Sequence, residues 1–356
     1  MFKKYILWVI TALVILLLAT QAQSAIYYAK DSMRICYEII IPTLFPFFVC
    51  SGFLVYSGFG SVLAKAARGI MRPLFNVAPS GAAAFILGII SGYPLGAITA
   101  VQLYKCGAMS KSEAERLLSF CSNSGPLFII GSVGVSVYGK LSYGVILYMI
   151  HIAASVITGI FFRFRGRAHH NSPPMVLKTD EKSISESFSA ALRSSVESIL
   201  TVCFSIIFFS TVSRTLLGMF SLPPLLDAAA SGLCEFSTGV LKTSALDTDL
   251  YAKLIITSFI VGFSGICVHI QVMTSVYGSG LSLKPYIFGK ILHGFIAAVI
   301  TAAVFSIYRP ALSVFSPANA VMSGAFTASS MMVCISAAAA AAASAIVYLT
   351  SSKGKE

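Results

Sequence analysis

Charged side chains are scarce in this sequence. Asp, Glu, Lys and Arg make up 11% of its 356 residues, whereas 57% are apolar and the mean hydropathy is +0.86. Soluble globular domains carry about 25% charged residues, because their surfaces face water. The composition therefore excludes a soluble domain and indicates an integral membrane protein.

The sequence also lacks the short motifs of enzyme active sites. It contains no G-x-x-x-x-G-K-[ST] phosphate loop, no G-x-S-x-G nucleophile elbow, no H-E-x-x-H metal motif and no pair of carboxylates at a useful spacing. We therefore expect neither an enzyme nor a pump that hydrolyses ATP within this chain. Any transport would be driven by an ion gradient or by the gradient of the substrate itself.

Metal and cofactor sites are not expected either. The eight cysteines show no C-x-x-C pair and no Cys/His ligand spacing, and most lie within apolar runs, as small buried thiols do. The adjacent His169 and His170 fall in a polar stretch and are expected in a solvated loop. No cofactor is predicted, and the identity of a coupling ion, H⁺ or Na⁺, is left open.

What the chain does contain is a series of apolar runs of about 20 residues, the length at which a helix crosses a bilayer. They predict an all-α polytopic membrane protein with about 8–10 membrane segments. A shorter run lies at 226–241. The full-length runs are 5–25, 36–60, 80–103, 118–138, 142–162, 195–218, 252–276, 286–308 and 318–349.

One of these runs is interrupted by polar and helix-breaking residues. The stretch from Ser119 to Gly134 reads S-F-C-S-N-S-G-P-L-F-I-I-G-S-V-G. Proline removes a backbone donor and glycine loosens the same turn, so polar main chain is left exposed at membrane depth. Such main chain persists only where protein or a wet cavity covers it. We expect a broken transmembrane segment that lines a substrate site.

Landmarks in the first half of the chain recur in the second half. The spacing of Arg34 and Glu38 returns at Arg193 and Glu197, each pair placed to bond along a helix. Three further landmarks recur at an offset of about 140 residues, in the same order. In these landmarks, Ser91–Gly96 corresponds to Cys234–Gly239, Ser124-Gly125 corresponds to Ser264-Gly265, and His151 corresponds to His293. Two structural repeats are therefore predicted.

Basic residues lie at the ends of the apolar runs, which is the positive-inside pattern rather than a nucleic-acid surface. With the N-terminus inside and a re-entrant, non-crossing segment at 80–103, most of them face the cytoplasm, Lys290 among them. The same path enters the first repeat from outside and the second from inside. The repeats are thus expected to be inverted, the arrangement that supports alternating access.

These patterns divide the chain into five parts. The first run ends at a sequence that resembles a signal cleavage site, but it is long for a signal, and an uncleaved helix is favoured. The last part carries seven consecutive alanines, which suit close helix packing. The parts are an N-terminal transmembrane helix at 1–28, a first repeat at 30–163, a cytoplasmic linker at 164–189, a second repeat at 190–310, and a C-terminal Ala-rich transmembrane helix with tail at 311–356.

The polar residues at the breaks are the candidate binding site. Half-helices direct unpaired N–H groups and positive dipole ends at the membrane midplane, which suits an anionic substrate. Glu235 would take up a coupling ion and His269 would meet an anion or titrate. The alternatives are kinked helices, a surface position for Glu235, and helix-to-helix hydrogen bonds for His269 and Gln271. The candidates are Ser91, Gly92, Tyr93, Ser122, Asn123, Ser124, Gly125, Glu235, Ser237, Thr238, Ser264, Gly265, His269 and Gln271.

Four strings resemble the YlbJ-type sporulation integral membrane proteins, within the wider group that carries the nucleoside-recognition or Gate domain. They are the interrupted stretch above, the earlier G-I-I-S-G-Y-P-L-G-A, and the later E-F-S-T-G and G-F-S-G-I-C-V-H-I-Q. The resemblance covers roughly residues 30 to 310 and is most specific at N-S-G-P. It carries over Gly92, Asn123, Ser124, Gly125, Glu235, Gly239, Ser264, Gly265, His269 and Gln271 as motif positions.

The resemblance implies transport of dipicolinic acid from the mother cell across the outer forespore membrane during sporulation. Half-helix N-termini, Asn123 and hydroxyls would suit the two carboxylates, and Tyr93 or Phe236 would stack on the ring. Nothing in the sequence specifies a nucleoside. The partners implied are this small anion and the lipid bilayer, with homo-oligomers left open. The alternatives are a carrier of nucleosides or another metabolite, and a non-transporting scaffold of the spore envelope.

The predicted topology is tested by cysteine labelling. Single cysteines at Lys140 and Lys178, in a background without native cysteines, should react with a membrane-impermeant reagent from opposite sides, because an odd number of membrane crossings separates them. Intact and permeabilised cells distinguish the two sides. Labelling of both positions from one side would contradict the inverted arrangement.

Overall fold

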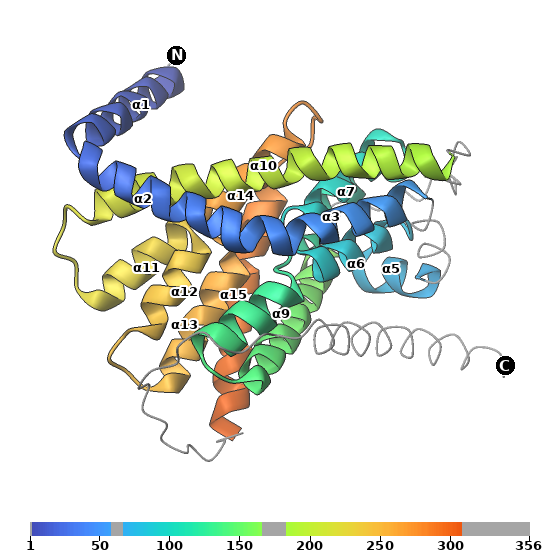
Figure 1. The fold of residues 1–356 in the computed structure, drawn as a ribbon. Helices are drawn as coiled ribbons and strands as arrows, with labels where there is room; N and C mark the ends of the chain where they lie inside the picture. Colours follow the sequence, from blue (N-terminus) through green and yellow to red (C-terminus); the bar gives the residue numbers. More distant parts are fainter. Residues whose placement is uncertain (1, 58–66, 166–182, 308–356) are drawn as a thin grey trace.

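The computed structural model describes residues 2–57, 67–165 and 183–307, and in these ranges the chain is helical without any β-strand (Figure 1). The predicted run at 318–349, both loop histidines and most of the linker lie outside the described residues. The elements are α1 (Phe2–Thr20), α2 (Ala22–Ile35), η1 (Cys36–Ile40, π-helical), α3 (Ile41–Tyr56), α5 (Arg68–Phe75), α6 (Gly81–Ser91), α7 (Leu95–Lys105), α8 (Lys111–Cys121), η2 (Leu127–Val137, π-helical), α9 (Leu141–Phe162), α10 (Ile184–Leu217), α11 (Pro224–Cys234), α12 (Phe236–Ser244), α13 (Leu250–Phe263), α14 (Gly265–Val276) and α15 (Lys284–Ile307).

Four helical segments among the described residues are long and apolar enough to cross a membrane: α9, α10, α13 with α14, and α15. A fifth candidate is the pair α1 and α2, which bends by 96° near Gln21, so the predicted N-terminal helix is not one straight rod. Among the described residues, the runs at 80–103 and 118–138 form shorter helices that meet at breaks. The prediction of an all-α polytopic membrane protein is confirmed.

The outward faces of the long helices are apolar. Phe161 on α9, Phe204 on α10, and Phe295 and Val299 on α15 are all more than half exposed. Large contiguous apolar surfaces are rare on soluble monomers, whereas hydrocarbon favours them. These faces are suited to contact with lipid.

Two pairs of short helices fold back on themselves as hairpins. Helices α6 and α7 pack at Gly88 and Gly96, and a Cβ atom on either glycine would overlap the carbonyl oxygen of Cys121, at the end of α8. Helices α11 and α12 pack in the same way at Gly232 and Gly239. Glycine is required here because only a residue without a side chain lets the main chains approach so closely.

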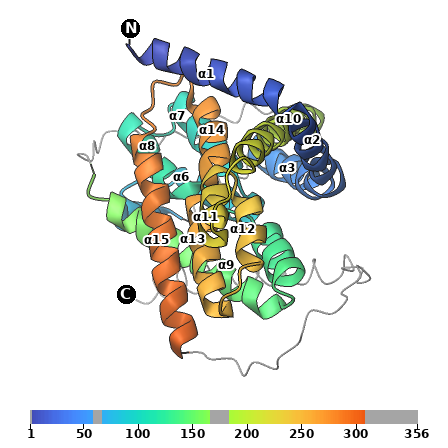
Figure 2. The same ribbon diagram turned by 90° about the vertical axis from the view of Figure 1, so that its left-hand side faces the viewer.

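Helices that the sequence pairs as equivalent also contact each other. Helix α10 lies alongside α2 and α3, crosswise to the bundle of α9, α13 and α15 (Figures 1 and 2). Helix α9 packs against α15, its counterpart in the second half. A twofold relation between halves would bring such counterparts together at its axis. Inversion of the two repeats stays a prediction.

The predicted ion pairs at the repeat starts differ from each other. Arg34 and Glu38 form the expected pair, with Nε and Oε1 2.9 Å apart. Arg193 and Glu197 form no ion pair in the part of the chain that the structure describes, and the prediction for them is wrong. Both side chains are exposed, and an exposed ion pair at this spacing stabilises a helix by only about 0.3–0.5 kcal/mol.

The hairpin packing predicts a stability difference between two glycines. Gly96→Ala should destabilise the protein by about 1–3 kcal/mol, because its methyl group meets the Cys121 carbonyl. Gly131→Ala in η2 is the control, since the nearest atom to an added Cβ there is 3.8 Å away. Thermal unfolding of the purified protein in detergent measures both. Equal melting temperatures would contradict the described packing.

Candidate functional site

The first predicted break is present as an interruption of the helix. Helix α8 ends at Cys121, and η2 begins only at Leu127. Ser122, Asn123 and Ser124 between them are almost fully buried, so no water reaches their main chain from the surface. The alternative of a merely kinked helix is therefore wrong at this position.

The second break is tighter. Ser264 and Gly265 between α13 and α14 adopt left-handed conformations, with φ of 80° and 75°. A serine with positive φ is unusual and costs about 1 kcal/mol or more. Ser264 is also fully buried and its side chain does not cap α14. The first turn of α14 thus keeps its N–H groups without a side-chain acceptor.

Each hairpin tip packs against the break in its own half. Gly92, which has φ of 84°, faces Gly125, and a Cβ on Gly92 would lie 2.9 Å from the Gly125 nitrogen. In the second half, a Cβ on Gly265 would lie 3.3 Å from the Cys234 carbonyl oxygen and 3.1 Å from the Phe236 nitrogen. The candidate glycines therefore permit main chain to touch main chain.

The two tips also meet each other. The rings of Tyr93 and Phe236 lie edge to face with centroids 5.7 Å apart, and Phe128 of η2 contacts Phe236 at 4.8 Å. The hydroxyl of Tyr93 donates a hydrogen bond of 2.7 Å to the carbonyl of Val261, three residues before Ser264. All four interruptions thus converge on one buried region.

Three residues that sequence analysis did not assign to the site lie at the first break. The Lys290 ammonium donates to the carbonyl of Ser122 at 3.0 Å and lies 3.4 Å from Nδ1 of His293. His293 Nε2 lies 3.0 Å from the carbonyl of His151, and the Ser124 N–H donates to His151 Nε2 at 3.0 Å. The two imidazole rings are 4.4 Å apart.

These contacts set the tautomer of each histidine. A carbonyl only accepts, so Nε2 of His293 carries its proton and Nδ1 offers a lone pair to Lys290. Nε2 of His151 accepts from a main-chain N–H and so has no proton, which leaves the proton on Nδ1. Both imidazoles are therefore neutral acceptors toward the first break. The landmark that paired His151 with His293 in the sequence was the signal for them.

The sequence placed Lys290 at the cytoplasmic side, and the structure corrects this. Its side chain is 0% exposed and lies inside the bundle. The only hint in the sequence is that Lys290 lies one helical turn before His293, within an apolar run. Charge counting treats every basic residue near the end of a run alike, and so it missed this one.

Several buried polar atoms at the breaks have no hydrogen-bond partner of standard geometry. They include the amide oxygen of Asn123, whose nitrogen donates to the Phe120 carbonyl at 3.0 Å, and the hydroxyls of Ser122 and Ser264, which lie near the hydroxyls of Tyr286 and Tyr93. Nε2 of His269 is a fourth. Leaving such a group unpaired costs about 1–3 kcal/mol. Groups of this kind mark places where a ligand, ion or water completes the bonding.

Glu235 forms the N-cap of α12, and its uptake of a coupling ion stays a prediction. Its carboxylate accepts hydrogen bonds from the N–H groups of Ser237 and Thr238, at 3.0 and 2.8 Å, and from both of their hydroxyls. It is buried, so a surface position is wrong. Glu235 caps α12 and already places a negative charge at that helix N-terminus, so Ser237 and Thr238 are not free for a substrate.

His269 and Gln271 are not brought together. Nδ1 of His269 lies 3.2 Å from the hydroxyl of Tyr286 on α15, which matches the alternative of a helix-to-helix hydrogen bond. Gln271 instead donates to the Cys267 sulfur one turn earlier on α14, at 3.5 Å. Residues two apart on a helix point to different faces. Of these two residues, only His269 keeps a buried ring nitrogen without a hydrogen-bond partner and stays in the candidate site.

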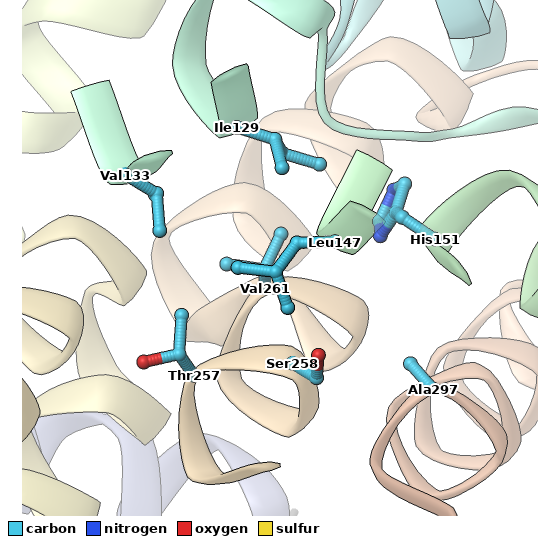
Figure 3. A pocket seen from close by; sticks show the side chains of 8 residues that line it. All are labelled: Ile129, Val133, Leu147, His151, Thr257, Ser258, Val261 and Ala297. Atoms are coloured by element: carbon cyan, nitrogen blue, oxygen red, sulfur yellow. The ribbon is translucent and has the colours of Figure 1, made fainter. Parts of the chain in front are cut away.

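Two hollows adjoin this region. A small cavity of about 10 Å³, enough for roughly one water, lies between η2, α9, α13 and α15, where His151, Thr257 and Ser258 are its polar members (Figure 3). A larger open groove of about 270 Å³ runs between α7, α10 and α14. It extends from Pro94 at the first hairpin tip to Lys105 at the far end of α7, and its α10 wall is polar, with Ser194, Glu197, Ser198 and Thr201.

Among the described residues, no group of three or more His, Cys, Asp or Glu side chains is placed to hold a metal ion.

Comparison with known proteins gives one relative. The chain is 30% identical over 323 residues to the sporulation integral membrane protein YlbJ of Bacillus subtilis (strain 168), which covers 81% of this chain and 78% of the relative. No protein-family model matches the chain. No solved structure matches it.

The capping role of Glu235 is tested by its removal. Glu235→Ala should lower the stability of the purified protein by about 1–2 kcal/mol, because α12 loses its N-terminal acceptor. Glu197→Ala is the control, since this exposed carboxylate forms no ion pair in the described part of the chain and should change stability by less than about 0.5 kcal/mol. Chemical denaturation measures both. Unchanged stability of Glu235→Ala would argue against the cap.

Proposed function

The chain belongs to the YlbJ family of sporulation integral membrane proteins, and from this premise we propose that it carries a small organic anion, dipicolinate, across the outer forespore membrane during sporulation. One observation carries the proposal. Buried polar atoms without partners surround the meeting point of two broken helices, next to a buried ammonium group.

Transport accounts for these features better than a scaffold does. A protein that serves only as a binding platform gains nothing from unpaired groups inside the membrane, and each one costs stability. A carrier does gain, because its substrate completes the bonding during each cycle. The breaks place these unpaired groups at the centre of the bundle, which is where carriers with repeated halves bind their substrates.

The charges favour an anion. Lys290 is the buried cation at the first break, where η2 begins, and α14 begins at the second break. Neither helix has a side-chain cap, so the positive ends of both are available. The competing carboxylate, Glu235, is held by α12. The edge-to-face rings of Tyr93 and Phe236 offer a planar, aromatic substrate a surface beside these groups.

The two hollows suit one state of a transport cycle. The groove runs from Pro94 at the first hairpin tip to Lys105 at the far end of α7. The charge pattern assigns this end of α7 to the cytoplasm. On the other flank of the site, the cavity beside His151 has room for about one water. We infer a carrier whose groove opens toward the mother cell, where dipicolinate is made, while the breaks themselves are buried and closed toward the forespore.

Removal of two unpaired hydroxyls tests the proposal. The double variant Ser122→Ala and Ser264→Ala breaks no hydrogen bond of standard geometry, so its melting temperature should equal or exceed that of the wild type. Dipicolinate content of the forespores should nevertheless fall by about tenfold, the effect of losing one or two bonds to a charged ligand. Ser136→Ala, an exposed serine on η2, is the control.

Two outcomes would change the conclusion. Normal dipicolinate content in a well-inserted double variant would favour a scaffold. Binding of labelled dipicolinate to the purified protein that only nucleosides displace would replace dipicolinate by a nucleoside as the substrate.

A further inference from the structure

The ammonium group of Lys290 lies in a cage of neutral acceptors. It donates to the Ser122 carbonyl at 3.0 Å, lies 3.4 Å from the lone pair on His293 Nδ1, and faces the ring of Tyr93 at 5.1 Å from its centroid. A carbonyl oxygen, an imidazole nitrogen and an aromatic face all attract a cation. Three different elements build this cage: the first break, α15 and the first hairpin tip.

The cage contains no acidic partner. None of the four ion pairs among the described residues includes Lys290, and the nearest carboxylate on the second hairpin tip, Glu235, is occupied by its own helix. A lysine at membrane depth is costly and normally pairs with an acid or with main-chain carbonyls. Lys290 pairs with a main-chain carbonyl, that of Ser122, and its positive charge is left without an opposing charge.

The position of the cage is one that cation-coupled carriers use. Ser122 follows the last residue of α8, so its carbonyl belongs to the end of a broken helix that carries the negative dipole. Unwound carbonyls and half-helix C-terminal ends are the groups that coordinate a coupling Na⁺ in carriers with broken helices. At the first break, the ammonium group of the Lys290 side chain occupies the position that a coupling Na⁺ would take.

The counterpart of Lys290 in the first half is not a cation. The offset of 142 residues that relates His293 to His151 also relates Lys290 to Tyr148. The Tyr148 hydroxyl donates to the Ile89 carbonyl at 3.1 Å, so a neutral donor occupies the equivalent position. The positive charge is therefore a feature of the first break alone and not a consequence of the repeat.

We propose that Lys290 is a resident cation of the carrier, which takes the place of a coupling metal ion at the first break and holds a positive charge for the carboxylates of the substrate. This inference rests on the proposed function. It means that anion uptake does not require Na⁺, and that loss of the ammonium leaves a vacant cation cage next to the substrate.

Uptake by reconstituted protein tests the first consequence. Dipicolinate uptake into proteoliposomes that hold wild-type protein should be the same in sodium and in choline chloride. Lys290→Met should lower uptake by about tenfold or more in both salts, since a charged donor is lost. Lys284→Met is the matched control on the same helix, because Lys284 is exposed, and it should retain wild-type uptake. Sodium-dependent uptake by the wild type, or normal uptake by Lys290→Met, would overturn the inference.

A second measurement does not depend on transport, and it separates failure of this inference from failure of the proposed function. The melting temperature of wild-type protein in detergent should be insensitive to exchange of sodium for choline. Lys290→Ala should melt lower by about 2 °C or more and should be restored in part by propylammonium chloride, which can enter the vacated cage. Lys290→Arg, which keeps the charge, should melt near the wild type. A Lys290→Ala protein as stable as the wild type and indifferent to propylammonium would overturn the cage, whether or not dipicolinate is transported.

Discussion

Main chain that leaves a helix inside a membrane must find partners without water, and this constraint organises the centre of the molecule. The structure meets it with different groups at each interruption. At the first break, Lys290 donates a hydrogen bond to the Ser122 carbonyl, and His151 accepts one from the Ser124 N–H. At the second hairpin tip, the carboxylate of Glu235 accepts hydrogen bonds from N–H groups in the first turn of α12. What remains unpaired is a small set of hydroxyl, amide and imidazole atoms, and these define the candidate site.

Close main-chain contact is the second requirement, and glycine provides it. Both hairpins pack through glycine pairs, and each tip touches a break through Gly92 and Gly125 or through Gly265. These contacts tie the tips to the breaks, so a shift of one hairpin would move the groups around the site. The fold thereby connects the packing of α6, α7, α11 and α12 to the geometry of the candidate site. Cores of this kind are close-packed and rearrange between discrete states rather than deform gradually.

Sequence reasoning located the breaks because proline, glycine and polar residues in an apolar run have a direct backbone consequence. It found Ser122–Gly125, the tip at Gly92 and the turn at Ser264 for this reason. It missed contacts of residues whose role depends on tertiary position. Glu235 lies two and three residues before the N–H groups it accepts from, but glutamate is not a common N-cap, so the local pattern gave a weak signal. Lys290 was assigned by the charge pattern, which does not distinguish a lysine that points into the bundle from one at its end. Gln271 follows His269 by two residues, and helical geometry alone would have separated them.

We propose that the breaks of the two halves form one binding site for an anion. A cryo-electron microscopy map of the purified protein saturated with dipicolinate tests it most directly. We expect ligand density between the breaks, in contact with Ser122, Asn123 or Ser264 and within reach of Lys290. Density confined to the outer groove along α7, or an unchanged centre at saturating ligand, would contradict it.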